Sequence, residues 1–149
     1  MRAVVQRVTE SSVTVDGQIT GATDEGLVVL IGVEEGDTDK DVRYIADKVS
    51  GLRIFEDENE KMNLSVKDVG GSILAISQFT LLGDVRKGKR PSFITAEDPE
   101  IANGLYQQVC ENIRNQGIKV ETGIFQAHML VKINNNGPVT ILLDSRKTF

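Results

Sequence analysis

The chain has few of the residues on which common catalytic and structural sites are built. Its 149 residues include one cysteine, one histidine, three prolines and no tryptophan. With Cys110 as the single cysteine, no intramolecular disulfide can form. A Ser-His-Asp triad would have to use His128, and a zinc site would need that histidine, Cys110 and carboxylates. Neither kind of site is expected, and no metal or cofactor is predicted.

Long apolar runs and an excess of basic charge are also missing. No segment approaches the ~20 consecutive apolar residues of a membrane-spanning helix. The amino terminus turns polar too early for a signal peptide. The 17 basic and 22 acidic residues give a net charge of −5, which argues against a protein that coats nucleic acid by bulk electrostatics. We expect a cytoplasmic protein that binds no membrane and meets any polyanion locally.

The pattern of apolar residues predicts one domain of mixed α/β structure over residues 1–149. An apolar content of 40% is enough for one core, and no linker or repeat interrupts the chain. Capping signals place one helix from Thr38 to about residue 51 and a second from Pro99 onward. Asp16-Gly17 predicts a two-residue hairpin. Strands are predicted at residues 4–8, 12–15, 27–33, 53–55, 62–66, 73–76, 120–122, 129–133 and 139–143. The predicted fold is a three-layer sandwich of two mostly antiparallel or mixed sheets, with both helices on one outer face.

Polar side chains gather where one buried strand is predicted to end. Ser77, Gln78 and Thr80 supply two hydroxyls and an amide around the ring of Phe79. Ligand sites tend to form at strand ends, so this segment is a candidate site. The same groups are equally compatible with a simple role in satisfying the backbone at the rim of the sheet.

A basic loop follows this candidate site. Arg86, Lys87, Lys89 and Arg90 surround a glycine in an otherwise acidic chain. Cations gathered in this way favour contacts with phosphate groups. A solvated loop without a ligand is the alternative, and the segment by itself does not decide between the two.

The most unusual segment is Asn136-Gly137-Pro138, between two predicted strands. Asn136 and Gly137 tolerate the positive φ of a tight turn, so a turn is predicted here. Pro138 removes a backbone donor and fixes its own φ, and its peptide bond is one of only three in the chain that can plausibly be cis. A backbone stiffened in this way can act as a surface against which a ligand is fitted.

Taken together, these motifs resemble those of the D-aminoacyl-tRNA deacylase family, over the full length of the chain. The resemblance is carried by SQFTL at 77–81, GKRPSF at 88–93, NNNGPVT at 134–140, QRV at 6–8, SVTV at 12–15, KMNL at 61–64 and FQAHM at 125–129. It implies a metal-independent editing enzyme of translation, a homodimer that hydrolyses the ester between a D-amino acid and tRNA. It further implies that the Gly137-Pro138 bond is cis and that this step reaches the partner's active site.

The resemblance also implies roles for single residues. Asn136 and Gln126 depart from the form expected of the family, which often has Asp at the first position and often Gly or Ala at the second. The implied roles are catalytic for Ser77, Gln78 and Thr80, chirality-selecting for Gly137 and Pro138, substrate-binding for Phe79, Phe125 and Met129, and tRNA phosphate-binding for Arg86, Lys87, Lys89 and Arg90.

Several alternatives stay open. Thr80 could attack the ester itself, or water could attack with help from the tRNA 2′-hydroxyl. The protein could instead be a non-catalytic module that binds the tRNA end, or a general esterase that uses Ser77 or Thr80 with His128. A filter that works by excluding L side chains should admit glycine, which has no Cβ, so glycyl-tRNA, including that mischarged on tRNA-Ala, is a predicted second substrate.

Overall fold

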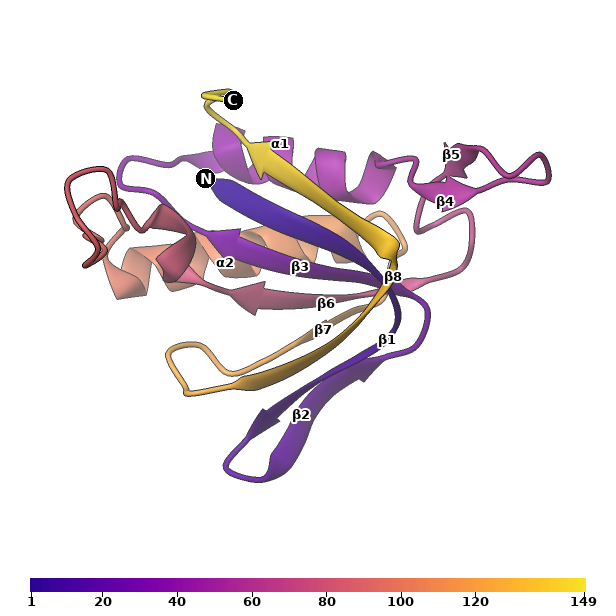
Figure 1. The fold of residues 1–149 in the computed structure, drawn as a ribbon, viewed down its shortest axis with the longest axis horizontal. Helices are drawn as coiled ribbons and strands as arrows, with labels where there is room; N and C mark the ends of the chain where they lie inside the picture. The colour runs from indigo at the N-terminus through magenta and orange to yellow at the C-terminus, as the bar shows by residue number, and fades with distance from the viewer.

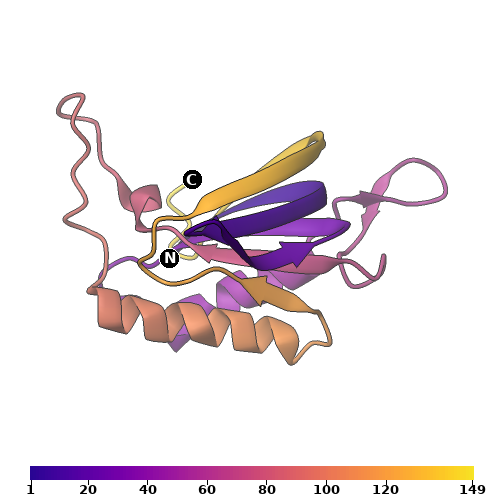
Figure 2. The same cartoon turned by 90° about the horizontal axis from the view of Figure 1, so that it is seen from below.

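The computed structural model describes residues 1–149 and has a mixed α/β fold. Its elements are β1 (Arg2–Val15), β2 (Gln18–Thr23), β3 (Gly26–Gly32), α1 (Asp39–Gly51), β4 (Phe55–Glu56), β5 (Met62–Leu64), β6 (Ser72–Ser77), the 3-10 helix η1 (Phe79–Leu82), α2 (Pro99–Arg114), β7 (Val120–Thr122) and β8 (Leu130–Asp144). Both helices lie on the same side of the sheet (Figure 2).

Six strands form one continuous sheet, in the order β2-β1-β3-β6-β7 with β8 also paired to β1. The pairs β3-β6 and β6-β7 are parallel, whereas β1 is antiparallel to β2, β3 and β8. Strands β1 and β8 both bend sharply, so the sheet curls (Figure 1). The mixed α/β prediction with two helices is confirmed. The three-layer form is not confirmed, because the six strands belong to one sheet and only β4 and β5 form another.

The two faces of the sheet carry separate apolar cores. Leu27, Val29 and Ile31 of β3 belong to a large cluster that includes the buried faces of α1 and α2. Val28, between them, belongs to a smaller cluster with Val8 and residues of β6. A strand covered on both faces reads as a continuous apolar run, which is why β3 was identifiable from sequence.

The predicted helix starts are confirmed. Thr38 and Asp41 form the reciprocal hydrogen bonds of a capping box at the start of α1. Asp98 accepts hydrogen bonds from the first turn of α2, whose first residue is Pro99. Asp16 and Gly17 form the predicted hairpin turn, both with positive φ. Neither helix has the length and apolar character needed to span a bilayer.

Two predictions about the strands were wrong. Residues 4–8 and 12–15 were predicted as separate strands, yet they belong to the single long strand β1. The turn predicted at Asn136-Gly137 does not reverse the chain, because the segments on both sides of it pair with β1. Gln6 pairs with Thr140 and Val8 with Asn135, so residues 136–139 fall outside the register. We call residues 136–138 the protrusion of β8.

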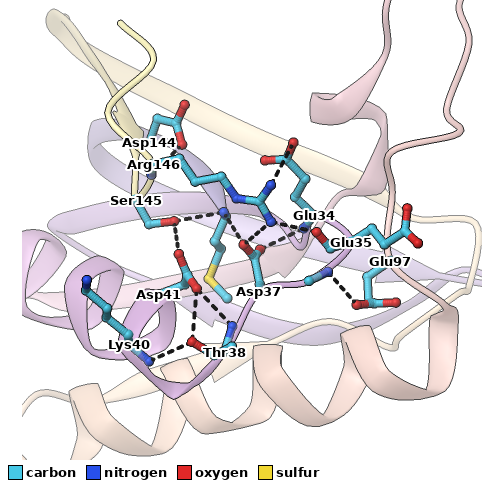
Figure 3. Close-up of polar contacts among 12 residues, drawn as sticks. Glu34, Glu35, Asp37, Thr38, Lys40, Asp41, Glu97, Asp144, Ser145 and Arg146 are labelled. Atoms are coloured by element: carbon cyan, nitrogen blue, oxygen red, sulfur yellow. Dashed lines mark hydrogen bonds and ion pairs between the residues drawn. The ribbon is translucent and has the colours of Figure 1, made fainter.

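A buried ionic network fastens both ends of the chain to the start of α1 (Figure 3). The α-amino nitrogen of Met1 donates hydrogen bonds to Asp37 Oδ1 and Ser145 Oγ, each at 2.8 Å. Met1 and Asp37 have no exposed side-chain surface in this pair. Arg146 adds a second cation, with Nη2 3.1 Å from Asp37 Oδ1. Two cations on one carboxylate compensate for the cost of burying it.

The same network reaches toward α2. Ser145 Oγ donates to Asp41 Oδ1 at 2.6 Å, and the Gly36 amide donates to Glu97 Oε2 at 3.1 Å (Figure 3). Burial acts to raise the pKa of Asp41, but hydrogen bonds from Ser145 and Thr38 outweigh it and hold that pKa below its ordinary value. A carboxyl whose pKa is lower in the folded state than in the unfolded state stabilises the fold at pH values above its unfolded-state pKa. This contribution is lost as the pH falls through the folded-state pKa.

Replacing Asp37 with asparagine should strongly destabilise the protein, because the Met1 ammonium would stay buried without its counter-charge. We expect a loss of ~3 to 5 kcal/mol in the free energy of unfolding, measured by chemical denaturation. The control is Asp39→Asn on the exposed first turn of α1, which should stay within ~0.5 kcal/mol of the wild type. Equal effects of the two substitutions would show that the network contributes no more than surface charge.

Candidate functional site

A cavity of about 630 Å³ opens at the carboxyl end of β6. Because β3, β6 and β7 are parallel, their carboxyl ends meet at the same edge of the sheet, which is where ligands bind in such folds. The cavity is lined by η1, by the start of α2 and by the segment that leads into β8. Its lining includes Ser77, Gln78, Phe79, Thr80, Phe125 and Met129. The structure therefore brings together all six residues that were predicted to be catalytic or to bind substrate.

The local fold turns the chain at this edge. The Gln78 amide donates to the Ile31 carbonyl at 2.7 Å, so the pairing with β3 continues one residue beyond β6. The backbone then turns into η1. Gly32 allows this turn to pack closely, because a methyl group there would lie 2.6 Å from Leu82 Cδ2 and 3.0 Å from the Gln78 carbonyl oxygen.

Thr80 has a defined hydrogen bond, but not to a basic group. The Gln78 side-chain amide donates to Thr80 Oγ1 at 3.0 Å, which leaves the hydroxyl proton of Thr80 free to donate into the cavity. The backbone N–H groups of Phe79 and Thr80, the first two residues of η1, have no acceptor within the chain. The site thus offers several donors, and no carboxylate or imidazole is hydrogen-bonded to Thr80, although Glu97 and Asp98 also line the cavity.

Aromatic rings form the apolar walls of the cavity. Phe79, which is 56% exposed, meets the edge of Phe93 with 5.1 Å between ring centroids. Phe125 lies 6.4 Å from the ring of buried Tyr106, whose hydroxyl donates to the Ala75 carbonyl at 2.7 Å. Burial raises the pKa of Tyr106 far above its ordinary value, so its hydroxyl stays protonated. Sequence reasoning assigned no functional role to either residue: Phe93 entered only as the last residue of the GKRPSF motif, and Tyr106 falls on the apolar stripe of the second helix, which is expected to face the core.

The basic loop is attached to this cavity. Its two ends are joined by the backbone pair of Asp84 and Ser92, and Phe93 lines the cavity just after it. Arg86 binds Asp84 through two nitrogens, at 2.9 and 2.7 Å. Hydrogen bonds from Arg86 hold the pKa of Asp84 well below its usual range. The charge of Arg86 is therefore largely compensated, whereas Lys87, Lys89 and Arg90 are exposed without an ion pair.

Gly137 and Pro138 lie elsewhere in the chain. Their peptide bond is cis, as the resemblance implies. Both residues are exposed in the protrusion of β8 and do not line the cavity. Within one chain, the residues predicted to select chirality and those predicted to bind the substrate are thus separate.

Buried Arg7 anchors the protrusion. Its Nε donates to the Asn136 carbonyl at 3.1 Å, and its Nη1 donates to the Ile54 carbonyl at 2.7 Å and to Glu56 Oε2 at 2.9 Å. A methyl group on Gly137 would lie 3.0 Å from Arg7 Nη2. In the sequence, Arg7 stood out only as part of the QRV motif, with no role assigned, because its partners are far away along the chain.

Gln126 and His128 follow Phe125 closely in the chain, and of the two only Gln126 lines the cavity. Gln126 has a φ of 65° and lines the cavity. A positive φ is unfavourable for a residue other than glycine. His128 is exposed and makes no hydrogen bond to Ser77 or Thr80, so the triad arrangement does not form. No three His, Cys, Asp or Glu side chains are placed to hold a metal ion.

Comparisons with known proteins agree with these motifs. The family model described as D-Tyr-tRNA(Tyr) deacylase matches residues 4–144. The chain is 62% identical to a D-aminoacyl-tRNA deacylase of Koribacter versatilis and 58% identical to one of Thermotoga petrophila, over 100% of each chain. A solved structure named c-Myc DNA Unwinding Element Binding Protein superposes with a TM-score of 0.91 at 43% identity, covering 97% of this chain and 98% of that one.

A more distant structure shares the fold. A probable eukaryotic D-amino acid tRNA deacylase superposes with a TM-score of 0.79 at 17% identity, covering 95% of this chain and 97% of that one. At this level of identity the likeness concerns the fold alone.

Replacing Arg7 with methionine should loosen the protrusion while keeping most of the side-chain volume. We expect faster hydrogen exchange at the Val139 amide and a rise of the Glu56 pKa toward its ordinary value, because the hydrogen bond from Arg7 is the largest cause of its lowering. NMR measures both. Arg53→Met, in the same hairpin region and bonded to Asn63, is the control and should change neither. Unaltered exchange in Arg7→Met would show that the protrusion holds its shape alone.

Proposed function

The chain belongs to the D-Tyr-tRNA(Tyr) deacylase family, and we propose that it hydrolyses the ester bond of D-aminoacyl-tRNA while rejecting L-aminoacyl-tRNA. The products are free tRNA and the D-amino acid. The observation that carries the proposal is the cavity at the carboxyl end of β6, which combines the polar groups of residues 77–80 with the apolar walls of Phe125 and Met129. The reaction takes place in the cytoplasm, where aminoacyl-tRNA is used.

The site acts mainly by positioning. An aminoacyl ester is already activated, so held geometry and oxyanion stabilisation can supply much of the rate. Water attacks the carbonyl carbon, the bond to the tRNA oxygen breaks, and that oxygen receives a proton. The 2′-hydroxyl of the tRNA assists, since no carboxylate or imidazole is hydrogen-bonded to Thr80. Each well-placed donor to the developing oxyanion contributes ~2.7 to 4 kcal/mol, and the free N–H groups of Phe79 and Thr80 are the donors in reach.

The 3′ end of the tRNA enters between the aromatic walls, and its acceptor stem meets the basic loop. Lys87, Lys89 and Arg90 are the phosphate contacts, since they are exposed and unpaired in the loop that leads to Phe93 in the cavity wall. Arg86 contributes less than its neighbours because Asp84 already binds it. Phosphate contacts of this kind position the RNA without reading its sequence.

Chiral selection requires a second copy of the chain, because the protrusion is remote from the cavity of its own chain. The face of the sheet opposite the helices offers the interface. Val4 pairs with Leu30 on one side and with Leu142 on the other, so the three side chains form an apolar row. Leu142 is 59% exposed, which is unusual for a large apolar residue unless a partner covers it.

The register is compatible with such a homodimer. Ser77 lies level with Ile31 and Ala3, whereas the protrusion lies level with Arg7, four residues further along β1. The two positions are therefore ~13 Å apart along the strand direction at ~3.3 Å per residue. A two-fold axis that passes midway between them exchanges them, so that each protrusion meets the cavity of the other subunit. The active site then lies at the subunit interface.

A main-chain wall suits the task of selection. A misplaced methylene in a soft pocket is discriminated by only ~1 to 3 kcal/mol, or roughly 10 to 200-fold. Gly137 and Pro138 present backbone, and the ring of Pro138 fixes its φ, so the wall cannot rotate aside as a side chain does.

Exclusion of the L side chain also predicts how the enzyme treats glycine. Since glycine has no Cβ to exclude, glycyl-tRNA, including glycine mischarged on tRNA-Ala, is also hydrolysed.

Two other functions are less well supported. A non-catalytic module that binds the tRNA end would use the same walls and basic loop. A general esterase would need His128 beside Ser77 or Thr80, and no such hydrogen bond exists. The name of one similar structure refers to a DNA element, but a net charge of −5 does not favour binding to duplex DNA through bulk charge.

Hydrolysis of D-, L- and glycyl-tRNA by the purified protein tests the function directly. We expect rapid release of D-amino acid and glycine and little release of L-amino acid, followed as the loss of labelled aminoacyl-tRNA. If D-aminoacyl-tRNA stays intact, the non-catalytic tRNA-end binding module is the remaining candidate function. Intact glycyl-tRNA beside rapid D-hydrolysis would show that the D side chain is recognised positively.

Mixed dimers test where selection takes place. Pro138→Ala should weaken rejection of L-aminoacyl-tRNA by ~10-fold or more, and Phe125→Asp should disable the cavity. In a purified heterodimer of the two variants, the only working cavity faces the intact Pro138 of the other chain, so we expect L-rejection to return. The Pro138→Ala homodimer is the control. A heterodimer as permissive as that homodimer would place selection within one chain.

A further inference from the structure

Gly123 lies next to the side chain of Met129, which lines the cavity. It follows β7, and a methyl group added to it would lie 2.5 Å from Met129 Sδ. A carbon atom cannot approach a sulfur atom that closely, so a Cβ and the present position of the thioether exclude each other. The φ of Gly123 lies outside the left-handed region, so space and not backbone conformation restricts this position.

The neighbours of Gly123 leave no other room for a methyl group. It would also lie 3.3 Å from Ile76 Cδ1 and 3.4 Å from Val13 Cγ2, and both residues are buried in the smaller core. The space that Gly123 and Met129 share with Tyr106 and Phe125 is too narrow for a water molecule. Met129 has a flexible side chain and adapts more readily than its branched neighbours, so it is the residue that would move.

Displacement of Met129 changes the cavity whichever way the side chain turns. Met129 lines the cavity beside Phe125, and on its other side it borders an open groove formed with Leu30, Val131 and Ile133. A thioether pushed into the cavity fills part of it. A thioether pushed into the groove removes the wall on which a ligand rests.

We propose that Gly123 is a positioning residue, which determines the shape of the substrate cavity by leaving a recess for the Met129 thioether. The proposal rests on the assignment of the cavity to the aminoacylated end of tRNA. Gly123 itself contacts no substrate and acts only through Met129. Its effect should therefore fall on binding, whereas the donors at residues 77–80 and the chemical step stay in place.

The first test is Gly123→Ala, assayed with D-aminoacyl-tRNA. We expect KM to rise roughly 10-fold, the lower end of what a misplaced methylene causes, with kcat within about 2-fold of the wild type. Gly104→Ala is the matched control, because a methyl group on that exposed glycine of α2 meets no atom within 4 Å. It should leave KM unchanged. A wild-type KM for Gly123→Ala would overturn the proposal, as would an effect on kcat alone.

The second test restores the space. In Gly123→Ala/Met129→Ala the new methyl group occupies a recess that the thioether has vacated, so the double variant should have the KM of Met129→Ala alone. Effects that multiply would overturn the proposal. If Gly123→Ala fails to fold, recovery of folding in the double variant with that same KM supports it, and failure of both overturns it.

The variant Met129→Ala separates this inference from the proposed function. A raised KM in Met129→Ala beside a wild-type KM in Gly123→Ala would reject the role of Gly123 and retain the cavity as the substrate site. A wild-type KM in Met129→Ala would reject the cavity assignment, and the role of Gly123 with it.

Discussion

The pairing of β1 with β3 on one side and β8 on the other is the interaction that fixes the positions of both the candidate cavity and the protrusion of β8. Through β3 and then β6, it places the carboxyl end of β6 and the cavity. Through β8, it places the protrusion that carries Gly137 and Pro138. Because one strand holds both partners in register, the spacing between cavity and protrusion is a property of the sheet. In a dimer that packs through the face of the sheet opposite the helices, the sheet itself would set the distance between cavity and protrusion, with no flexible segment between them.

Polar interactions then hold the loops around the sheet, each in a different way. The Met1 ammonium and Arg146 converge on Asp37 in a buried network that also leads to Glu97 at the cavity. Arg7, also buried, connects the protrusion to the hairpin of β4 and β5. The exposed pair of Asp84 and Arg86 contributes little to stability, since surface ion pairs are worth ~0 to 1 kcal/mol. Its effect is that Asp84 compensates the charge of Arg86, one of the four cations of the basic loop.

The candidate site offers backbone donors and packed apolar walls more than reactive side chains. Thr80 is hydrogen-bonded to Gln78 and to no carboxylate or imidazole. Such a site suits an activated ester, for which orientation supplies much of the rate. It also explains why small residues matter here. Gly32 lets η1 pack against the sheet, and Gly123 lets Met129 fold back, so the absence of a side chain shapes the cavity at two points.

The sequence by itself determined the local features: both helix starts from their caps, the hairpin at Asp16-Gly17, the apolar strand β3 and the motif at residues 77–80. These signals lie within a few residues of the structure they specify, which is why they can be read without the fold. Only the tertiary structure decided that residues 136–138 form a protrusion and not a chain-reversing turn, because that depends on pairing with β1. The anchoring of Asn136 by Arg7 joins residues 129 positions apart, and the separation of Pro138 from its own cavity depends on the whole sheet. Contacts over such separations leave no periodic or capping pattern in the sequence, so packing alone decides them.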